Sequence, residues 1–342
     1  GGGQLGRMSA LAAATLGYRV HVFCPEKDAP AVQVTNRHTQ AAYDDTEALA
    51  EFARAVDVVT FEFENVPART ADLLAASGKP VRPNPRALEV AQDRLTEKRF
   101  VVALGGHTAP FAAVEARADL AGAVAAVGVP GILKTCRDGY DGKGQWRLTD
   151  AADVAWLDLP AKRLIYEGLV RFVAEFSVLL CRGADGALRY WDLPENSHEG
   201  GILALSKVPA RPMIQAQRNA ARKLAAQIAQ ELDYVGVLAC EFFATDQGPV
   251  FNEMAPRVHN SGHWTIEGAL TSQFENHIRA VCGLPLGDTA LAAKGVAMRN
   301  LIGEQAHEWQ EILADPANHL HLYGKHGARP GRKMGHVTRL EL

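Results

Sequence analysis

Apolar residues recur along the chain in two patterns: short continuous runs, and longer stretches at helical spacing. Short runs bounded by turn residues predict strands, and the spaced pattern predicts amphipathic helices. Because strands and helices interleave, the sequence predicts an α/β fold. The chain as a whole is expected to belong to the α+β class. Strands are expected at residues 19–24, 55–65, 131–134, 164–170, 172–181, 188–193 and 295–301, and helices at 8–16, 87–104, 215–232 and 266–281.

Two further apolar runs flank Thr245-Asp246-Gln247-Gly248, which predicts a β-hairpin. Folding about Gln247 places Glu241 opposite Glu253, with Cβ atoms roughly 5 Å apart. Like charges at such positions are destabilising, so a hard divalent cation with oxygen ligands is a natural partner. Asn252 adds a neutral oxygen, although strict alternation would aim it at the other face. The alternative is that both glutamates lie on a solvated sheet face.

The N-terminal residues satisfy G-x-G-x-x-G through Gly1, Gly3 and Gly6. The helix and strand expected at 8–16 and 19–24 complete the turn-helix-strand portion of a dinucleotide-type unit, whose preceding strand is not part of this sequence. This stretch alone suggests a nicotinamide dehydrogenase. However, a single glycine motif is weak evidence, and the strand ends in Cys-Pro-Glu without an acidic residue cleanly at its tip.

The strand expected at residues 55–65 carries Glu62 and Glu64 near its carboxyl end. Open α/β sheets bind ligands beyond the carboxyl ends of their strands, so both carboxylates are candidates to hold a polar substrate. A charged strand exit into solvent is the alternative. The proline-rich passage at 79–85 closes this first unit.

A short strand ends on Lys134 and leads into the glycine-rich segment 138–145. Such a loop after a strand lysine is typical of a lid over polyphosphate, where backbone N–H groups and Lys143 supply positive charge. The G-K-[S/T] ending of a Walker loop is missing, and a plain β-hairpin turn is the alternative. The glycines of this segment are Gly139, Gly142 and Gly144.

Further polar residues follow the next strands. The strand at 164–170 leaves through Glu167-Gly168, where backbone and carboxylate could contact an adenine edge and a ribose hydroxyl. Glu175 lies on the following strand, and His198 is expected in a polar loop. Near the C-terminus, a basic cluster suits a phosphate monoester, or is an ordinary basic tail. This cluster comprises Lys325, Arg332 and Lys333.

Composition narrows the function classes. The 342 residues are 47% hydrophobic and 22% charged, as in a soluble globular protein. The net charge of -3 gives no general attraction to nucleic acid or an anionic membrane, and no apolar run approaches the roughly 20 residues that span a bilayer. Five scattered cysteines without C-x-x-C favour free thiols and a cytoplasmic location.

The order of these parts resembles the ATP-grasp superfamily and, within it, the N5-carboxyaminoimidazole ribonucleotide synthetase family. The motifs that carry the resemblance span nearly the whole chain in the family's order. They are G-G-G-Q-L-G-R-M at 1–8, T-F-E-F-E-N-V-P at 60–67, D-R-L-T-E-K at 93–98, G-Y-D-G-K-G-Q at 139–145, N-E-M-A-P-R-V-H-N-S-G-H at 252–263 and G-R-K-M-G-H at 331–336.

The resemblance implies an ATP-grasp fold with three domains around a cleft. Residues 1–92 would form a Rossmann-like pre-ATP-grasp domain without its first strand. Residues 93–283 would form the ATP-grasp domain, with a mobile lid at about 105–170. Residues 284–342 would form a small C-terminal domain, which the family usually continues beyond Leu342.

The implied activity is ATP- and bicarbonate-dependent carboxylation of 5-aminoimidazole ribonucleotide (AIR) through carboxyphosphate, in purine biosynthesis. ATP and Mg²⁺ (or Mn²⁺) would be the cofactors, the other partners would be small molecules, and a homodimer is expected. The alternatives are a formate-dependent glycinamide ribonucleotide transformylase, another ATP-grasp carboxylate-amine ligase, or a non-catalytic nucleotide-binding scaffold. A scaffold would not need both Glu241 and Glu253, and H-N-S-G-H and T-F-E-F-E-N favour the AIR carboxylase.

The resemblance also assigns residues to each part of the site. The residues implied for ATP are Arg94, Lys134, Gly139, Tyr140, Asp141, Gly142, Lys143, Gly144, Gln145, Glu167, Gly168, Leu169, Val170, Glu175, His198, Asn252 and Glu253. Those implied for the metal are Glu241 and Glu253, with Asn252 assisting. Those implied for AIR are Gln4, Leu5, Glu64, Tyr140, His259, Asn260, Lys325, Arg332 and Lys333. The implied catalytic residues are Asp141, which would manage the amine proton, Arg257 and Lys325.

Overall fold

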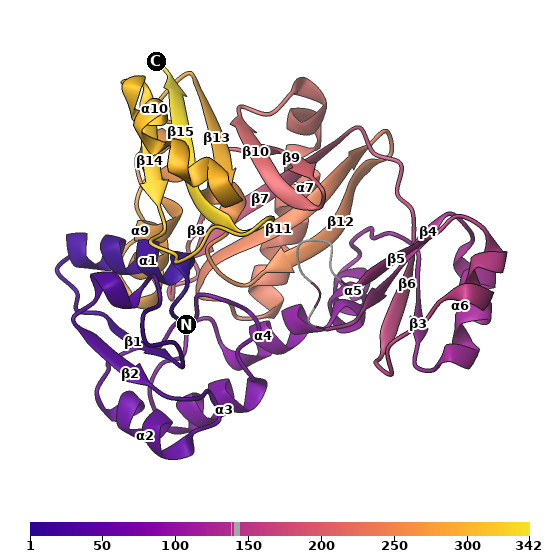
Figure 1. Cartoon of the computed structure of the whole chain (residues 1–342), viewed down its shortest axis with the longest axis horizontal. Helices are drawn as coiled ribbons and strands as arrows, with labels where there is room; N and C mark the ends of the chain where they lie inside the picture. The colour runs from indigo at the N-terminus through magenta and orange to yellow at the C-terminus, as the bar shows by residue number, and fades with distance from the viewer. Residues whose placement is uncertain (138, 140–143) are drawn as a thin grey trace.

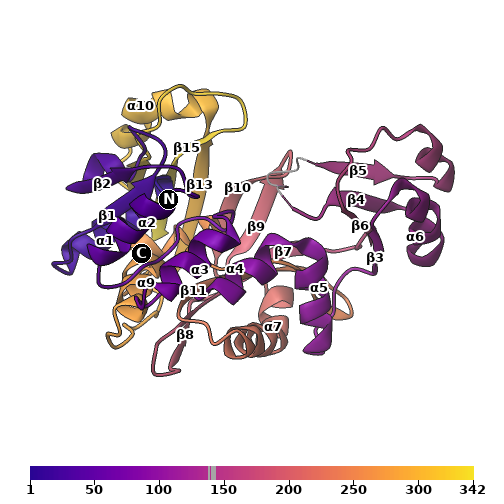
Figure 2. The same cartoon turned by 90° about the horizontal axis from the view of Figure 1, so that it is seen from below.

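The structure, a computed structural model, describes residues 1–137, 139 and 144–342 and arranges them in three regions (Figure 1). The N-terminal region lies beside the end of a large central sheet to which the C-terminal strands belong. A small lobe stands apart on the other side (Figure 2). Four predicted site residues lie outside the described residues: Tyr140, Asp141, Gly142 and Lys143.

The N-terminal region confirms the predicted helix and strand that follow the glycine motif. The strand predicted at 55–65 is wrong, because that segment forms a single parallel bridge, from Val59 to Val81. This segment and β1 both line a cavity of about 750 Å³. Because a cavity lies beside it, the segment has no adjacent strand, among those described, with which to form a ladder. The elements are α1 (Gln4–Thr15), β1 (His21–Cys24), a 3₁₀ turn (Val32–Val34), β2 (Arg37–Gln40), α2 (Thr46–Arg54) and α3 (Ala68–Ala76).

The helix predicted at 87–104 is divided in two, α4 (Pro85–Gln92) and α5 (Arg94–Ala103). Asp93 between them is extended, and its carboxylate accepts a hydrogen bond from the Thr96 backbone N–H at 3.0 Å. An aspartate in this role caps a new helix and directs its first turn. The break therefore fixes the orientation of α5 independently of α4.

The separate lobe is a four-stranded antiparallel sheet in the order β3-β6-β4-β5, with one helix packed on it. The segment after Lys134 connects β4 to β5, and Lys134 pairs with Gln145 across that hairpin. Most of the predicted lid loop, residues 138 and 140–143, lies outside the described residues, so the choice between a lid and a plain hairpin turn stays a prediction. The elements are β3 (Phe111–Val114), α6 (Leu120–Val127), β4 (Gly131–Thr135), β5 (Gln145–Leu148) and β6 (Leu164–Gly168), with 3₁₀ turns at Arg117–Asp119 and Ala151–Trp156.

The central sheet has nine strands in the order β12-β11-β7-β9-β10-β13-β15-β14, with β8 paired to β7. It runs without interruption across the predicted boundary at 283/284. Its strands are β7 (Ala174–Arg182), β8 (Leu188–Tyr190), β9 (Glu195–Glu199), β10 (Ile202–Val208), β11 (Gly236–Thr245), β12 (Gly248–Ala255), β13 (Gly295–Ile302), β14 (Asn318–Leu322) and β15 (Lys333–Glu341).

The polar loop predicted around His198 is wrong, since these residues form β9 inside the sheet. Asn196 makes this possible. Its amide donates to Ser177 Oγ and accepts from Ser206 Oγ, both at 2.8 Å. Because both neighbouring strands supply a partner, a buried polar side chain carries no unpaired hydrogen-bonding group here.

Helices cover both faces of the central sheet. α7 (Pro212–Glu231) packs on one face, and α1 and α9 (Gln273–Val281) pack on the other. The helix predicted at 266–281 is divided into α8 (Thr265–Gly268) and α9, because Ser272 caps a new start. α10 (Trp309–Ala314) lies beside β14, and 3₁₀ turns occupy Asn260–Gly262 and Gly303–Glu308.

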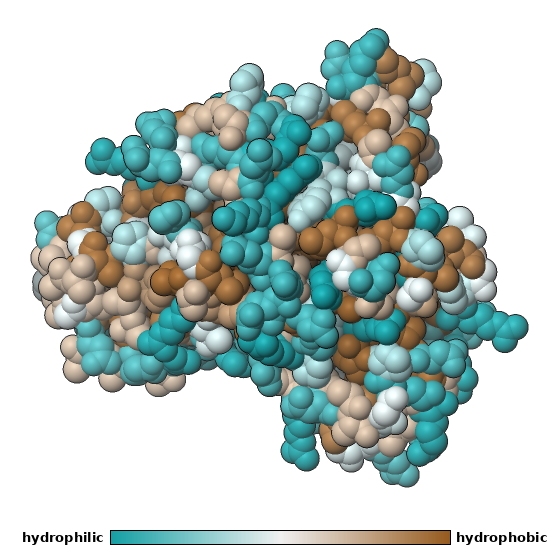
Figure 3. Space-filling model, turned by 180° about the vertical axis from the view of Figure 1, so that it is seen from behind, coloured by the Kyte–Doolittle hydropathy of each residue, from teal (hydrophilic) through white to brown (hydrophobic). Residues whose placement is uncertain are grey.

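Hydrophilic side chains form a band across the middle of the rear face, between the separate lobe and the rest of the molecule (Figure 3). Among the described residues, no helix combines the length and apolar character needed to cross a bilayer.

Candidate active site

The hairpin formed by β11 and β12 sets Glu241 directly opposite Glu253, which confirms the predicted register. A β-bulge follows this pair, because Phe242 pairs with Phe251 and Asn252 has no partner. The expectation that Asn252 would face away is therefore wrong. Asn252 and Glu253 line the same cavity, while the residues on either side of them, Phe251 and Met254, both pack beneath α7.

This cavity, of about 350 Å³, lies between the separate lobe and the hairpin. Fifteen of the residues implied by the resemblance contribute to its lining: Arg94, Lys134, Gln145, Glu167, Gly168, Leu169, Val170, Glu175, His198, Glu241, Asn252, Glu253, His259, Asn260 and Lys333. They come from both lobes and from β15, so the fold brings together segments that are far apart in the sequence. Its walls can therefore contact one ligand from several sides.

Three cations neutralise two carboxylates of the cavity wall, Glu253 on the hairpin and Glu167 on the lobe. Arg94 Nη1 lies 2.8 Å from Glu253 Oε2, and Lys134 Nζ lies 3.0 Å from Glu167 Oε2. Lys98 Nζ lies 3.4 Å from the same Glu167 oxygen. Burial alone would raise the pKa of Glu253, but the charge and hydrogen bond of Arg94 outweigh it and lower that pKa to about 2. Glu253 is therefore a carboxylate at neutral pH.

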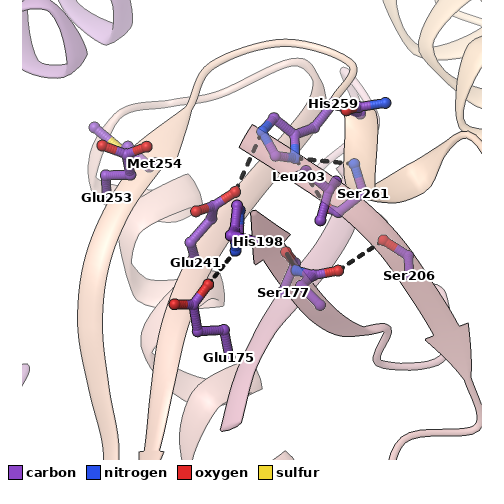
Figure 4. A network of polar contacts seen from close by, with 12 residues as sticks. Glu175, Ser177, His198, Leu203, Ser206, Glu241, Glu253, Met254, His259 and Ser261 are labelled. Atoms are coloured by element: carbon purple, nitrogen blue, oxygen red, sulfur yellow. Dashed lines mark hydrogen bonds and ion pairs between the residues drawn. The ribbon is translucent and has the colours of Figure 1, made fainter. Parts of the chain in front are cut away.

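Glu241 is less well compensated than Glu253. Burial, and then the charge of Glu253, raise its pKa to about 7. Its neighbour His259, at 3.3 Å, is neutral at pH 7, because burial and the charge of Arg257 lower the imidazole pKa to about 3. Figure 4 shows Glu241 between His259 and the paired His198 and Glu175, with Glu253 on the adjacent strand. The pocket is therefore short of positive charge at Glu241.

These donors fit a magnesium ion. Glu241, Glu253 and Asn252 offer hard oxygen ligands on one cavity wall, next to uncompensated negative charge. Within the part of the chain that the structure describes, no three His, Cys, Asp or Glu side chains form a complete metal site. Mg²⁺ is usually held by one or two carboxylates together with water and substrate phosphates. The site thus fits an ion that arrives with a nucleotide.

A second cluster follows the hairpin, where Arg257 forms a two-pronged ion pair with Glu64. Arg257 Nη2 lies 2.9 Å from Glu64 Oε1. Burial raises the pKa of Glu64, but the Arg257 charge outweighs it and leaves that pKa lowered. The pair ties the N-terminal region to the turn that presents His259 and Asn260 to the cavity. Neither partner is among the described residues that line the cavity.

The remaining substrate candidates lie in the basic C-terminal segment and at the start of α1. Lys325 Nζ donates to the Lys333 carbonyl at 2.7 Å, and Arg332 Nη1 donates to the Gly327 carbonyl at 3.0 Å, so the basic segment is held together locally. Gln4 and Leu5 begin α1, outside the cavity lining formed by the described residues. The Leu5 side chain is buried in the core.

The Glu62 carboxylate is held by the protein's own glycine motif and does not simply point into solvent, which was the alternative considered above. Its carboxylate accepts hydrogen bonds from the backbone N–H groups of Gly3, at 2.8 Å, and Gly6, at 3.2 Å. These are the donors that a dinucleotide phosphate would use in a G-x-G-x-x-G loop. The glycine motif is therefore occupied by the protein's own carboxylate, which argues against the dehydrogenase interpretation.

Sequence reasoning missed several residues of the site. Phe172 and Phe243 stack at 4.6 Å between ring centroids and contribute an apolar wall. Phe243 lies two positions after Glu241, so strand alternation could have placed it on the same face. Glu97 and Lys98 are buried behind Glu253, and both belong to the D-R-L-T-E-K motif.

Comparison with known families agrees with this architecture. The ribonucleotide synthetase preATP-grasp domain model matches residues 1–92, and the ATP-grasp domain model matches residues 99–274. The phosphoribosylaminoimidazole carboxylase C-terminal domain model matches residues 296–341. The predicted fold class is confirmed.

The chain is similar over its whole length to individual proteins. It is 50% identical to the N5-carboxyaminoimidazole ribonucleotide synthase of Brucella melitensis, over 100% of this chain and 95% of that protein. The crystal structure of N5-carboxyaminoimidazole ribonucleotide synthetase from Thermus thermophilus matches with a TM-score of 0.93 and 46% identity, over 100% and 92% of the two chains. A synthase from Aspergillus clavatus, in complex with ADP and AIR, matches with a TM-score of 0.91 and 30% identity, over 99% and 92%.

Proposed function

The chain belongs to the N5-carboxyaminoimidazole ribonucleotide synthase family of ATP-grasp ligases, and we propose how its residues perform that family's reaction. The function is ATP-dependent carboxylation of AIR in purine biosynthesis. We propose bicarbonate as the carbon source and ADP and phosphate as the other products. The observation that carries this proposal is the opposed Glu241–Glu253 pair, facing a cavity that also holds Arg94 and Lys134.

For the nucleotide, Arg94 and Lys134 contact the phosphates, and residues 139–145 cover them. Glu167, Gly168, Leu169 and Val170 border the adenine, Glu175 binds the ribose, and His198 lies along the nucleotide. Glu241 and Glu253 hold Mg²⁺ or Mn²⁺, with Asn252 assisting. When bound, the ion supplies positive charge against the phosphate oxygens. Support comes from the shared cavity and from the charge deficit at Glu241.

For AIR, we propose a site between the nucleotide and the N-terminal region. His259 and Asn260 contact the substrate from the turn after β12, and Arg257 is held in place by Glu64. Lys325, Arg332 and Lys333 bind the 5′-phosphate, because a two-donor guanidinium and neighbouring ammonium groups suit a phosphate monoester. Gln4, Leu5 and Tyr140 complete the set, and Lys325 and Arg257 assist the reaction.

The chemistry needs no protein nucleophile. Bicarbonate attacks the γ-phosphorus of ATP and releases ADP, while Arg94 and Lys134 stabilise the charge that develops on the phosphoryl oxygens. The resulting carboxyphosphate breaks down to CO₂ and phosphate, and the exocyclic amine of AIR attacks the CO₂. Asp141 accepts the amine proton. Closure of the lobe over the site excludes water, which would otherwise hydrolyse the carboxyphosphate.

We also propose that the protein is cytoplasmic and forms a homodimer. Scattered unpaired cysteines, most of them buried, suit a reducing compartment. Light scattering at several protein concentrations tests the dimer. A mass of about one chain at every concentration would contradict it.

One assay separates this function from its nearest rival, the formate-dependent glycinamide ribonucleotide transformylase. Phosphate release from ATP is measured with bicarbonate, with and without AIR, and separately with formate and glycinamide ribonucleotide. We expect release to depend on bicarbonate and AIR. Strong release with formate and glycinamide ribonucleotide, and none with AIR, would overturn the proposal.

A further inference from the structure

One edge of the central sheet, formed by β12, lies at the proposed metal site. Among the described strands, β12 is one of the two terminal ones, and its outer edge is paired only through a short parallel bridge from Phe251 to Thr108. Exposed strand edges in proteins are usually covered or capped. Here the first turns of α5 lie against that edge, and three of its side chains reach residues 252–254.

Two consecutive residues of α5 hold the backbone on either side of Glu253. Glu97 Oε1 accepts a hydrogen bond from the Met254 N–H at 2.7 Å, and Lys98 Nζ donates to the Asn252 carbonyl at 3.0 Å. Three residues before Glu97, Arg94 binds the Glu253 carboxylate itself at 2.8 Å. One helix thus contacts the metal ligand and both of its neighbours.

The β-bulge explains why such support is needed. An extra residue in one strand has no partner in the ladder, and the backbone around it is less well defined by strand pairing. Asn252 is that residue, immediately before Glu253. Contacts from outside the sheet must therefore set the direction in which the Glu253 carboxylate points.

Burial shows that Glu97 and Lys98 act on the protein rather than on a ligand. Only 2% of Glu97 and 1% of Lys98 is exposed, and neither is among the described residues that line the cavity. Burying two ionisable side chains is costly unless they are paired and hydrogen-bonded. Lys98 also lies 3.4 Å from Glu167, so it links the metal strand to the lobe wall where the adenine is proposed to bind.

We propose that Glu97 and Lys98 are positioning residues that clamp the backbone on both sides of Glu253 and so fix its carboxylate for metal binding. This inference rests on the proposed role of Glu253 as a metal ligand. Disrupting the clamp weakens the binding of a divalent cation with nucleotide and leaves the AIR site largely unchanged.

The test compares two substitutions of Glu97 with a matched control. Glu97→Leu removes the acceptor for the Met254 N–H, whereas Glu97→Gln keeps an oxygen at the same distance. Asn276 is the control, because it is also fully buried and its Oδ1 accepts from the Gly287 N–H at 2.7 Å, on α9. Asn276→Leu therefore removes a comparable clamp on the opposite face of the sheet.

Mn²⁺ binding in the presence of ADP is followed by electron paramagnetic resonance of free Mn²⁺, together with the KM values for Mg²⁺ and AIR. We expect Glu97→Leu to weaken Mn²⁺ binding tenfold or more, with the AIR KM at saturating metal within about twofold of wild type. Glu97→Gln restores binding to within about threefold. Asn276→Leu lowers the melting temperature but leaves Mn²⁺ binding unchanged.

Wild-type-like Mn²⁺ binding by Glu97→Leu would overturn the inference, and so would equal weakening in Asn276→Leu. If Glu97→Leu does not fold, Glu97→Asp and Lys98→Met replace it, since one shortens the acceptor and the other removes the Asn252 contact. Absence of Mn²⁺–ADP binding in the wild-type protein would instead contradict the proposed function. The two failures are therefore distinguishable.

Discussion

Two segments of this protein, the glycine motif at the N-terminus and the β11–β12 hairpin, contain residues typical of a nucleotide site. Their polar groups differ in whether they already have partners within the protein. In the loop Gly1–Gly6, the N–H groups of Gly3 and Gly6 point at Glu62 and are satisfied by it. In the β11–β12 hairpin, Glu241 and Glu253 face a cavity, and Glu241 lacks a full counter-charge. The donors of the glycine motif are therefore satisfied by the protein itself, whereas the carboxylates of the hairpin remain available to a ligand.

The difference shows that a motif identifies a site only when its polar groups remain available. Buried polar groups are almost always paired, and an internal partner serves as well as a ligand. Both segments contain suitable residues, but only the hairpin leaves charge uncompensated. Four substitutions test this contrast.

Glu253→Gln should have the largest effect. Removing a carboxylate from a metal site costs several kcal/mol of transition-state stabilisation, so we expect ATP turnover to fall by at least about a hundredfold. Steady-state phosphate release measures it, and circular dichroism should show an intact fold. Retention of more than a tenth of the wild-type rate would contradict the metal role of Glu253.

Arg257→Leu should affect the substrate side of the hairpin. It leaves Glu64, a carboxylate whose side chain is only 28% exposed, without its partner, which should cost about 1–3 kcal/mol of folding stability. We expect a lower melting temperature and an AIR KM raised at least tenfold, with the ATP KM within about twofold. An increase confined to the ATP KM would place Arg257 on the nucleotide side instead.

Glu62→Ala tests the closed segment. It leaves the N–H groups of Gly3 and Gly6 without their acceptor, which should cost about 1–3 kcal/mol of folding stability. Urea denaturation measures this loss, and the ATP KM should stay within about twofold of wild type. A large rise in that KM would mean that the glycine loop takes part in nucleotide binding after all.

The smallest expected effect is pH-dependent and comes from His198 and Glu175. Burial lowers the pKa of His198, but the hydrogen bond and charge of Glu175 outweigh it, so the pKa is raised above the usual 6.5. The pair therefore stabilises the fold fully below pH 6.5, and this stability is lost as pH rises through the raised value. Glu175→Gln should lower stability by no more than about 1 kcal/mol, and only at the acidic end. A deficit that grows with pH would contradict this assignment.

The sequence predicted the hairpin register because turn chemistry and strand periodicity are local. The bulge at Asn252 could not be predicted, since no residue type in the hairpin marks it, and the side chains of α5 that hold it lie about 150 residues earlier in the chain. The capture of the glycine loop by Glu62 is likewise a long-range contact. By contrast, the helix break at Asp93 was accessible from its capping chemistry alone.

The candidate site was predicted mainly from the motifs of the resemblance. These motifs assigned residues from distant segments of the chain to a single site. Periodicity alone would not have joined Arg94, Glu167 and Lys333, because they lie on a helix, a lobe strand and the C-terminal strand. Other features depend on tertiary packing. The strand at 55–65 failed because strand formation needs a neighbour, which local sequence cannot supply.

We propose that the hairpin, and not the glycine loop, holds the metal–nucleotide complex. The most direct test is a crystal structure of the protein with Mn²⁺ and ADP, with the ion located by its anomalous scattering. We expect a Mn²⁺ peak within coordinating distance of the carboxylates of Glu241 and Glu253. A peak remote from both carboxylates, or ADP phosphates bound at Gly1–Gly6, would contradict it.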